Sequence, residues 1–173
     1  MDIFVPDVYA QSIFSINYEK LKERNIKCLI FDLDNTLAPV EAKSPDIKIK
    51  NLIVKLEDMG FKIMIVSNSP MARVEPFKEG LNVDSAHSAM KPLKKKYKKI
   101  LRTYNFKDNE IACVGDQLLT DILGANRMGF TSILVNPIST NDFFFTKINR
   151  WFESKIMKKM GKRGVFTKGV YYD

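Results

Sequence analysis

The sequence predicts an α/β fold, a doubly wound, Rossmann-like sheet of five parallel strands with helices on both faces. Short continuous apolar runs, typical of strands buried on both sides, alternate with segments whose apolar residues recur at helical spacing. Polar residues follow directly after several of these runs, at the sheet edge where such folds place their sites. A length of 173 residues fits one such domain.

The first strand is expected at residues 28–33, CLIFDL, which end at the turn-prone residues 34–36. A helix then begins at Pro45 and Asp46 and stops near Gly60, because apolar residues recur between them at helical spacing. The rest of the chain repeats this succession of a strand and a helix.

The remaining elements continue the alternation. Further strands are expected at residues 61–66, 83–86, 111–116 and 131–137, and further helices at 71–79, 92–104 and 118–128. Pro92 stands at the first position of the third helix, where proline is favoured, while Gly80 and Gly129 end the second and fourth helices. Pro76 makes the second helix the least regular.

We expect residues 1–140 to form a single domain, with a core at 28–137 and an N-terminal flank at 1–27, followed by a basic tail at 141–173. Cys28 and Cys113 lie in apolar runs without metal-binding spacing, which argues against a disulfide-stapled or zinc-binding module and favours a reducing cytoplasm. No signal peptide is evident, and no apolar run is long enough to cross a bilayer, so membrane contact is expected to be peripheral.

Charge is segregated along the chain, whose formal net charge is +8. Residues 91–102 contain seven basic side chains and no acidic one, and residues 147–173 contain eight basic and two acidic side chains. The rest of the chain is mildly acidic. Two basic segments on an acidic body suit an anionic partner, either a membrane or a nucleic acid.

Polar side chains cluster at the first two expected strand ends. Asp32 and Asp34 lie on the same side of an extended chain and can share a divalent cation or attack an electrophile, although aspartates also simply end strands. Ser67 and Asn68 offer donors suited to phosphate oxygens, although both residue types are also common helix caps.

Two further positions complete the pattern. Lys91 precedes an expected helix start, where a cation is unfavourable unless an anionic site lies nearby. Asp116 follows another strand and can add a carboxylate to a metal site. Asp121 lies near enough to ligate or support the metal, but helix capping accounts for it slightly better.

In this order, the motifs resemble those of the haloacid dehalogenase superfamily, subclass IIIA, which lacks a cap domain. The resemblance covers residues 28–137 and rests on DLDNT, Ser67, Lys91 before a helix, and GDQLLTD. It implies a Mg²⁺-dependent phosphatase that forms an aspartyl-phosphate. Its implied roles are a nucleophile (Asp32), a general acid and base (Asp34), phosphate-binding groups (Ser67, Asn68, Lys91), metal ligands (Asp32, Asp116 and the Asp34 backbone carbonyl) and supporting residues (Thr36, Asp121).

No room exists for a cap domain, because 11 residues separate Asp34 from Asp46 and 23 separate Ser67 from Lys91. We therefore expect an open site, unless an oligomer or the tail covers it. An open site favours a phosphate carried on a large molecule, such as a lipid headgroup, a protein or a nucleic acid, over a small metabolite held by loops.

The flanking segments resemble a narrower group, the YqeG-like branch related to phosphatidylglycerophosphate phosphatases. This resemblance implies dephosphorylation of phosphatidylglycerophosphate on the inner face of a membrane. Two alternatives stay open, namely a phosphatase of a soluble sugar, nucleotide or phosphoprotein, and an RNA- or ribosome-binding protein with a vestigial site. Nucleic acid is not favoured, because the aromatic platforms of RNA modules are absent.

The tail predicts a basic amphipathic helix suited to an anionic membrane surface. Its apolar side would carry Phe144, Phe145, Ile148, Trp151, Phe152, Ile156 and Met160, with Asn141 and Asp142 as caps and Lys147 among its basic residues. Alternatively, this helix packs on the sheet or on a second subunit. For His87, the only histidine, we expect a structural or phosphate-adjacent role and no catalytic one. The sequence indicates no oligomeric state.

Overall fold

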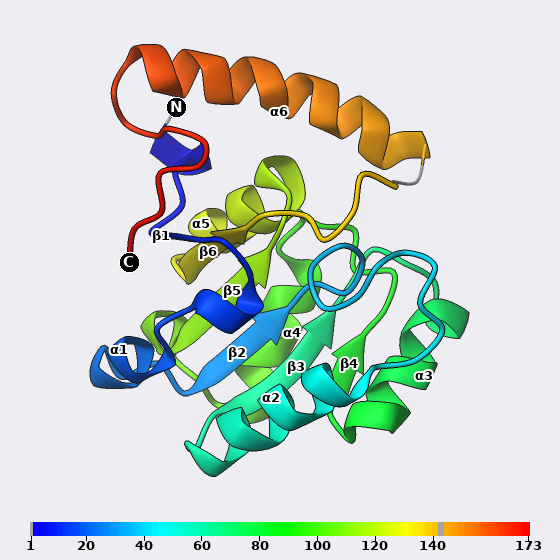
Figure 1. Ribbon diagram of the computed structural model, residues 1–173. Coiled ribbons are helices and arrows are strands. Elements are labelled where there is room, and N and C mark those ends of the chain that lie inside the picture. Colours follow the sequence, from blue (N-terminus) through cyan, green and yellow to red (C-terminus); the bar gives the residue numbers. More distant parts are fainter. Residues whose placement is uncertain (1, 142–143) are drawn as a thin grey trace.

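The computed structural model describes residues 2–141 and 144–173, without the side chains of Phe144, Phe145 and Lys147. Its centre is a parallel sheet of six strands in the order β1-β6-β5-β2-β3-β4 (Figure 1). The strands are β1 (Val8–Ala10), β2 (Cys28–Phe31), β3 (Lys62–Val66), β4 (Asp84–Ala86), β5 (Ile111–Gly115) and β6 (Thr131–Val135). The predicted doubly wound fold is confirmed, and no cap domain is evident among the described residues.

The prediction of five strands was wrong by one, because β1 lies within the N-terminal flank. Val8 of β1 pairs in parallel with Ile133 of β6. Three residues are too few to show a strand period, so β1 left no signal in the sequence. Its other edge is partly covered by the C-terminus, where Tyr172 and Tyr9 exchange two backbone hydrogen bonds of 2.8 and 2.9 Å.

Helices cover both faces of the sheet. Helices α1 (Tyr18–Glu23), α2 (Ile47–Asp58) and α3 (Met71–Leu81) lie on one face, and α4 (Lys95–Tyr104) and α5 (Leu123–Met128) lie on the other. A π-helical turn at Leu118–Ile122 precedes α5, and short 3₁₀ turns occur at Asp2–Phe4, Ile13–Ser15 and Asp108–Glu110. The chain leaves β2 in one direction and returns through β5 in the other, so the carboxyl ends of these strands form the switch point where such sheets bind ligands.

Helix α2 begins and ends where the sequence predicts. The Asp46 side chain accepts a hydrogen bond of 2.9 Å from the backbone N–H of Ile49, and Gly60 follows the helix with a φ of 92°. Gly129, with a φ of 76°, likewise ends α5. Both ends illustrate how caps and left-handed glycines mark helix limits in a sequence.

Two helix limits differ from the prediction. Helix α3 continues through Gly80 and ends before Asn82, which adopts the left-handed conformation. Gly80 serves packing instead, because a Cβ there would lie 2.8 Å from the Pro45 ring. Helix α4 begins at Lys95 and not at Pro92, since the intervening residues form a turn in which Leu93 N–H donates to the Met90 carbonyl over 2.9 Å.

The tail forms one long helix, α6 (Phe144–Lys162), which lies across the carboxyl-end side of the molecule (Figure 1). Met160 of α6 and Phe166 beyond it pack with Tyr9, Leu118 and Leu134 in a small core. The C-terminal segment therefore shares a core with β1 and β6. Of the expected tail features, Asp142 and the Phe144, Phe145 and Lys147 side chains lie outside the described parts.

Candidate active site

A buried lysine joins two aspartates at the switch point. Asp32 follows β2, Lys91 lies in the turn before α4, and Asp121 lies in the π-helical turn after β5. The Lys91 ammonium is 2.5 Å from a carboxylate oxygen of Asp32 and 2.6 Å from one of Asp121, and all three side chains are buried. These are charge-assisted hydrogen bonds in a low-dielectric setting, so they fix the three groups relative to one another.

Gly115 makes room for this arrangement. A Cβ at Gly115 would lie 2.2 Å from the Asp121 carboxyl carbon. The Asp121 carboxylate also accepts a hydrogen bond of 3.1 Å from the Gln117 backbone N–H. Asp121 therefore caps its own turn and contacts Lys91 at once, so the capping expected from the sequence is present, and its support of a metal stays a prediction.

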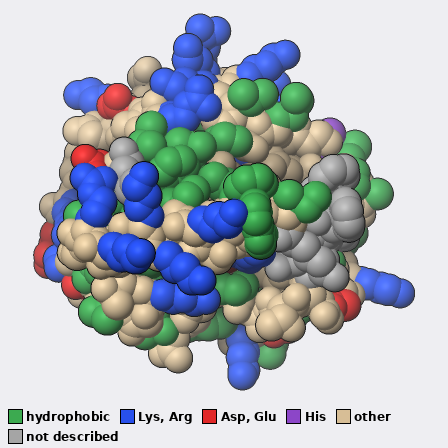
Figure 2. All heavy atoms as spheres, turned by 90° about the horizontal axis from the view of Figure 1, so that it is seen from above, with side chains coloured by type: hydrophobic (Ala, Val, Ile, Leu, Met, Phe, Trp, Pro, Cys, Tyr) green, Lys and Arg blue, Asp and Glu red, His purple; other side chains and the backbone are tan. Residues whose placement is uncertain are grey.

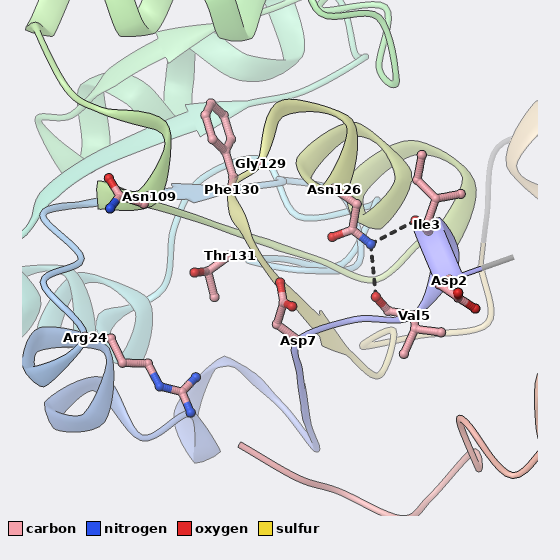
Figure 3. A pocket seen from close by; sticks show the side chains of 10 residues that line it. All are labelled: Asp2, Ile3, Val5, Asp7, Arg24, Asn109, Asn126, Gly129, Phe130 and Thr131. Atoms are coloured by element: carbon pink, nitrogen blue, oxygen red, sulfur yellow. Dashed lines mark hydrogen bonds between the residues drawn. The ribbon is translucent and has the colours of Figure 1, made fainter.

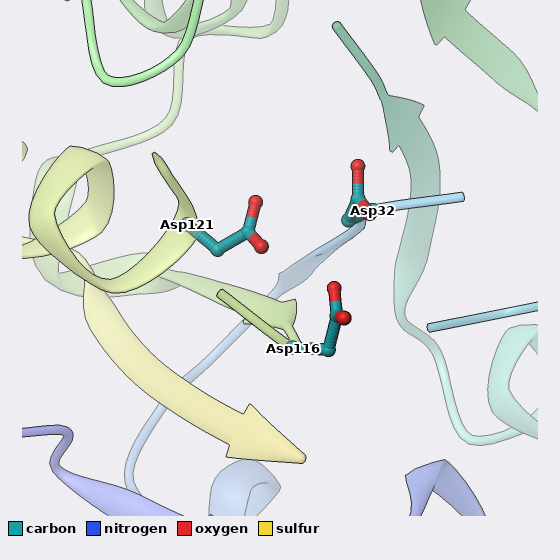
Figure 4. A group of neighbouring side chains, drawn as sticks. All are labelled: Asp32, Asp116 and Asp121. Atoms are coloured by element: carbon teal, nitrogen blue, oxygen red, sulfur yellow. The ribbon is translucent and has the colours of Figure 1, made fainter. Parts of the chain in front are cut away.

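Three carboxylates lie close together (Figure 4), and two of them contact Lys91. Ligand oxygens of Asp32, Asp116 and Asp121 all lie within 4.8 Å of one another, and all three residues are buried. Burial raises the pKa of the Asp32 carboxyl, against the lowering effect of Lys91, and burial also raises the pKa of Asp116. Such crowded negative charge and purely oxygen donors fit a hard divalent cation, and a buried aspartate group of this kind is typical of haloacid dehalogenase metal sites.

Asp116 is held by two further side chains. The Thr36 hydroxyl donates to one carboxylate oxygen of Asp116 over 3.2 Å. The Arg150 guanidinium of α6 pairs with the other oxygen and donates to the Asp116 backbone carbonyl over 2.7 Å. Sequence reasoning missed Arg150, since nothing in the tail distinguishes it from the other basic residues there.

Asp34 is not part of this aspartate group and has its own partners. The Ser69 hydroxyl donates to one of its carboxylate oxygens over 2.5 Å, and the Arg73 guanidinium, on α3, lies 2.9 Å from the other. Arg73 also donates to the backbone carbonyls of Pro39 and Ala42. Sequence reasoning missed Ser69 and Arg73, although a second serine after β3 and an arginine in the next helical turn offered a weak signal.

Ser67 and Asn68 differ in what their side chains do. Ser67 is buried, and its hydroxyl accepts a hydrogen bond of 3.0 Å from the Ser69 backbone N–H. The Asn68 amide instead bonds the backbone of Lys91, accepting from its N–H over 2.6 Å and donating to its carbonyl over 3.3 Å. Asn68 thus holds the turn that brings Lys91 to the aspartates.

A cavity of about 380 Å³ opens above these residues. Its described lining comprises Asp32, Asp34, Ser67, Asn68, Ser69, Pro70, Lys91, Gln117, Thr120, Thr146 and Asn149. Thr146 and Asn149 belong to α6, so the tail forms one wall of the site. His87 is not among these lining residues, and its ring nitrogen lies 3.3 Å from the Ser88 hydroxyl.

A second hollow, of about 520 Å³, lies away from the aspartates, beside the start of β6 (Figure 3). The N-terminal residues wall it on one side, where the Asn126 amide donates to the carbonyls of Ile3 and Val5 over 2.8 and 3.0 Å. Phe130 and Thr131 line it at the amino end of the strand. It is remote from the carboxyl ends where the buried charges converge, so the smaller cavity is the candidate active site.

Comparisons with known proteins agree with this geometry. The family described as mitochondrial PGP phosphatase matches residues 1–139. The chain is 38% identical to "Probable phosphatase YqeG" of Bacillus subtilis over 161 residues, which cover 93% of this chain and 94% of that protein.

A chloroplast and mitochondrial relative is more distant. "Phosphatidylglycerophosphate phosphatase 1" of Arabidopsis thaliana is 25% identical over 171 residues, which cover 93% of this chain and 49% of that protein. The chain therefore spans about half the length of this plant relative.

Solved structures share the fold at low identity. The 3-deoxy-D-manno-octulosonate 8-phosphate phosphatase of Moraxella catarrhalis, solved with magnesium and phosphate ions, superposes with a TM-score of 0.55 at 18% identity. The match covers 72% of this chain and 76% of that one. Among the described residues, no helix has the length and apolar character needed to span a membrane.

Proposed function

Because the chain belongs to the PGP phosphatase family, within subfamily IIIA of the haloacid dehalogenase phosphatases, we propose that it hydrolyses phosphatidylglycerophosphate to phosphatidylglycerol at a membrane surface. The phosphatase activity follows from the family. The observation that carries the chemical proposal is the buried Lys91 between Asp32 and Asp121 on the floor of the cavity. A phosphate brought there would meet a carboxylate nucleophile that is paired with a lysine.

In the proposed reaction, a carboxylate oxygen of Asp32 attacks phosphorus and the ester P–O bond breaks, which leaves an aspartyl-phosphate. Asp34, as the acid, gives its proton to the departing glycerol oxygen. Asp34 then takes a proton from water, whose oxygen attacks phosphorus and breaks the bond to Asp32. Splitting the displacement in this way and positioning each group supply the acceleration.

The other site residues are proposed to hold the phosphoryl group and the metal. Ser67 and Lys91 would bind phosphoryl oxygens, and Asn68 would act mainly by holding Lys91. Mg²⁺ would be bound by Asp32, Asp116 and the Asp34 backbone carbonyl, with Thr36 and Asp121 in support, and would neutralise charge on the transferring group. All of these donors are oxygens, and magnesium is the ion bound by the Moraxella relative.

Membrane contact is proposed for the outer face of α6. Ile148, Trp151 and Phe152 are 42%, 54% and 49% exposed on this face. The Lys155 ammonium lies 3.4 Å from the centre of the Trp151 ring, and Lys158, Lys159 and Lys162 are also exposed. Figure 2, which looks onto α6, shows apolar and basic side chains close together with few acidic ones. Aromatic rings beside lysines suit the headgroup region of an anionic bilayer.

The apolar residues of α6 were predicted to lie together on one side of the helix, but they divide between the protein core and the solvent-exposed face. Ile148, Trp151 and Phe152 are exposed, whereas Ile156 is half-buried and Met160 is buried in the small core. The stripe divides because the helix contacts the body along one side only, and the apolar arc is wide enough to extend beyond that side. Packing on the protein and an exposed aromatic face are therefore both present.

The proposal is tested by comparing phosphate release from phosphatidylglycerophosphate in mixed micelles with release from soluble sugar phosphates, nucleotides and phosphopeptides. We expect the lipid to be preferred, EDTA to abolish turnover and Mg²⁺ to restore it. Asp32→Asn, which keeps side-chain size, should lose activity by roughly a thousandfold or more, because it removes the nucleophile. A preference for soluble esters would refute the lipid assignment, and an active Asp32→Asn variant would refute the nucleophile.

A further inference from the structure

The wall of the cavity formed by α6 differs in chemistry from its floor. The floor carries the charged groups Asp32, Asp34 and Lys91. The described side chains of the wall are neutral hydroxyls and amides, namely Thr146 and Asn149 of α6 together with Gln117 and Thr120 after β5. A ligand with its phosphate on the floor would therefore meet uncharged hydrogen-bonding groups along its ester-linked part.

Helix α6 is fastened so that Thr146 and Asn149 line the cavity. Thr146, Asn149, Arg150 and Glu153 are spaced by three and four residues, which puts them on one side of a helix. Arg150 bonds Asp116, and the buried Glu153 carboxylate accepts a hydrogen bond of 2.9 Å from the Leu119 backbone N–H. Two anchors one turn beyond Thr146 and Asn149 fix the position of the wall relative to the metal site.

The wall also limits what can bind. Among the described lining residues none is aromatic, and Lys91 is the only cation. A nucleobase would thus lack a stacking partner among these described residues. At about 380 Å³ the cavity is near the small end of ligand pockets, which span roughly 300–1,000 Å³.

We infer that Thr146 and Asn149 of α6, with Gln117 and Thr120, form a subsite for the leaving group that takes a small neutral polyol such as glycerol. The helix thereby supplies the leaving-group contacts that a cap domain could otherwise provide. This inference rests on the proposed function, since it assigns the ester-linked part of the same substrate to that wall.

Two soluble esters test the subsite without a membrane. Glycerol 3-phosphate and n-propyl phosphate share a primary phosphate ester and differ by two hydroxyls. The wild-type protein should show a kcat/KM at least about tenfold higher for glycerol 3-phosphate, because the hydroxyl and amide groups of the wall would lack their partners with the propyl ester. Asn149→Leu and Thr146→Val should each reduce this ratio by about 3- to 10-fold, chiefly through the glycerol ester.

Ser154→Ala is the matched control, because Ser154 is exposed on α6 and its hydroxyl donates to the Trp151 carbonyl within the same helix. It should leave the ratio unchanged, and thermal unfolding should show that all variants fold. A wild-type ratio near one, an unchanged ratio in both wall variants, or an equal loss on both esters would overturn the subsite.

The same measurements separate this inference from the proposed function. A high wild-type ratio that falls in the wall variants supports the subsite even if phosphatidylglycerophosphate is not hydrolysed, an outcome that refutes only the lipid substrate. Rapid hydrolysis of the lipid with a ratio near one refutes the subsite and leaves the proposed function intact.

Discussion

Arg150 and Asp116, 34 positions apart, are joined by two contacts. The Arg150 guanidinium donates to the Asp116 backbone carbonyl over 2.7 Å and pairs with its carboxylate. Asp116 belongs to the carboxylate group that fits a divalent cation, so α6 reaches the metal site directly. A positive charge from the tail is therefore paired with a carboxylate that a metal would also use.

Arg150→Ala should bind Mg²⁺ more tightly than the wild-type protein. Removing a positive charge beside a cation site lowers the electrostatic cost of binding, and we expect the dissociation constant to fall roughly tenfold. Titration calorimetry with Mg²⁺ measures this change. Arg163→Ala is the charge-matched control, since Arg163 lies beyond the far end of α6 and its nearest acidic partner is Asp2 at 4.0 Å. Weaker Mg²⁺ binding in Arg150→Ala would contradict the expectation that the positive charge of Arg150 opposes binding of the cation.

Arg73→Gln should impair the proposed acid Asp34 in a way that depends on the leaving group. Arg73 lies 2.9 Å from the Asp34 carboxylate, and its loss should leave that carboxyl less well positioned. Alkyl esters need a proton on the leaving oxygen, whereas p-nitrophenol leaves readily without one. We expect kcat to fall about 10- to 100-fold for an alkyl phosphate, with a smaller fall for p-nitrophenyl phosphate.

Arg24→Gln provides the comparison for Arg73→Gln, because Arg24 is exposed and lines the hollow remote from the site. It should leave both rates unchanged. An equal loss on both esters in Arg73→Gln would indicate that Arg73 acts only on the fold.

The sequence predicted the parts of the site that follow strand ends. Asp32, Ser67 and Asp116 come directly after buried apolar runs, so parallel topology alone brings them to one edge of the sheet. The alternation of strands and helices could be predicted because buried parallel strands are continuously apolar. Residues of this kind can be located without coordinates.

The residues that the sequence left undetected act through contacts that no local pattern encodes. Arg150 reaches Asp116 only because α6 packs over the sheet edge, and Arg73 reaches Asp34 from a neighbouring helix. Asn68 was predicted to bind phosphate, which stays a prediction, but the bond of its side chain to the Lys91 backbone across 23 positions was not foreseen. Contacts between residues far apart in the chain determine these roles, and such contacts cannot be predicted from the local pattern of a single sequence.

Glu153→Gln should make stability less dependent on pH. Burial raises the pKa of the Glu153 carboxyl to about 7 from its usual value near 4.5. Between these values the folded protein keeps a proton that the unfolded chain releases, so this carboxyl lowers stability as pH rises from about 4.5 to 7. The amide cannot ionise and avoids this loss.

The measurement is thermal unfolding at pH 5.5 and pH 8. The melting temperature of Glu153→Gln relative to the wild-type protein should be higher at pH 8 than at pH 5.5, by on the order of 5 °C. Glu57→Gln, at an exposed position on α2, should show no such difference between the two pH values. A relative melting temperature that is the same at both would contradict a raised pKa at Glu153.

The double substitution Trp151→Ala with Phe152→Ala should weaken membrane binding while preserving the site. Both rings are about half exposed on the outer face of α6, so their loss removes apolar surface from the lipid contact and little from the core. Two aromatic side chains at an interface contribute on the order of 2 kcal/mol together, and we expect binding to anionic liposomes to fall at least tenfold. Co-flotation with vesicles of phosphatidylglycerol and phosphatidylcholine measures it.

Point substitutions test this face better than deletion of the tail. Deletion would also remove Thr146 and Asn149 from the cavity wall, Arg150 from Asp116, and Phe166 from the small core. Ile47→Ala with Val54→Ala is the matched control, because both residues are exposed apolar positions on α2, away from α6. Binding should also weaken with added salt, since lysines beside the rings attract the anionic surface. Equal flotation of the two double variants would show that the outer face of α6 is not the membrane contact, whatever the substrate in the cavity.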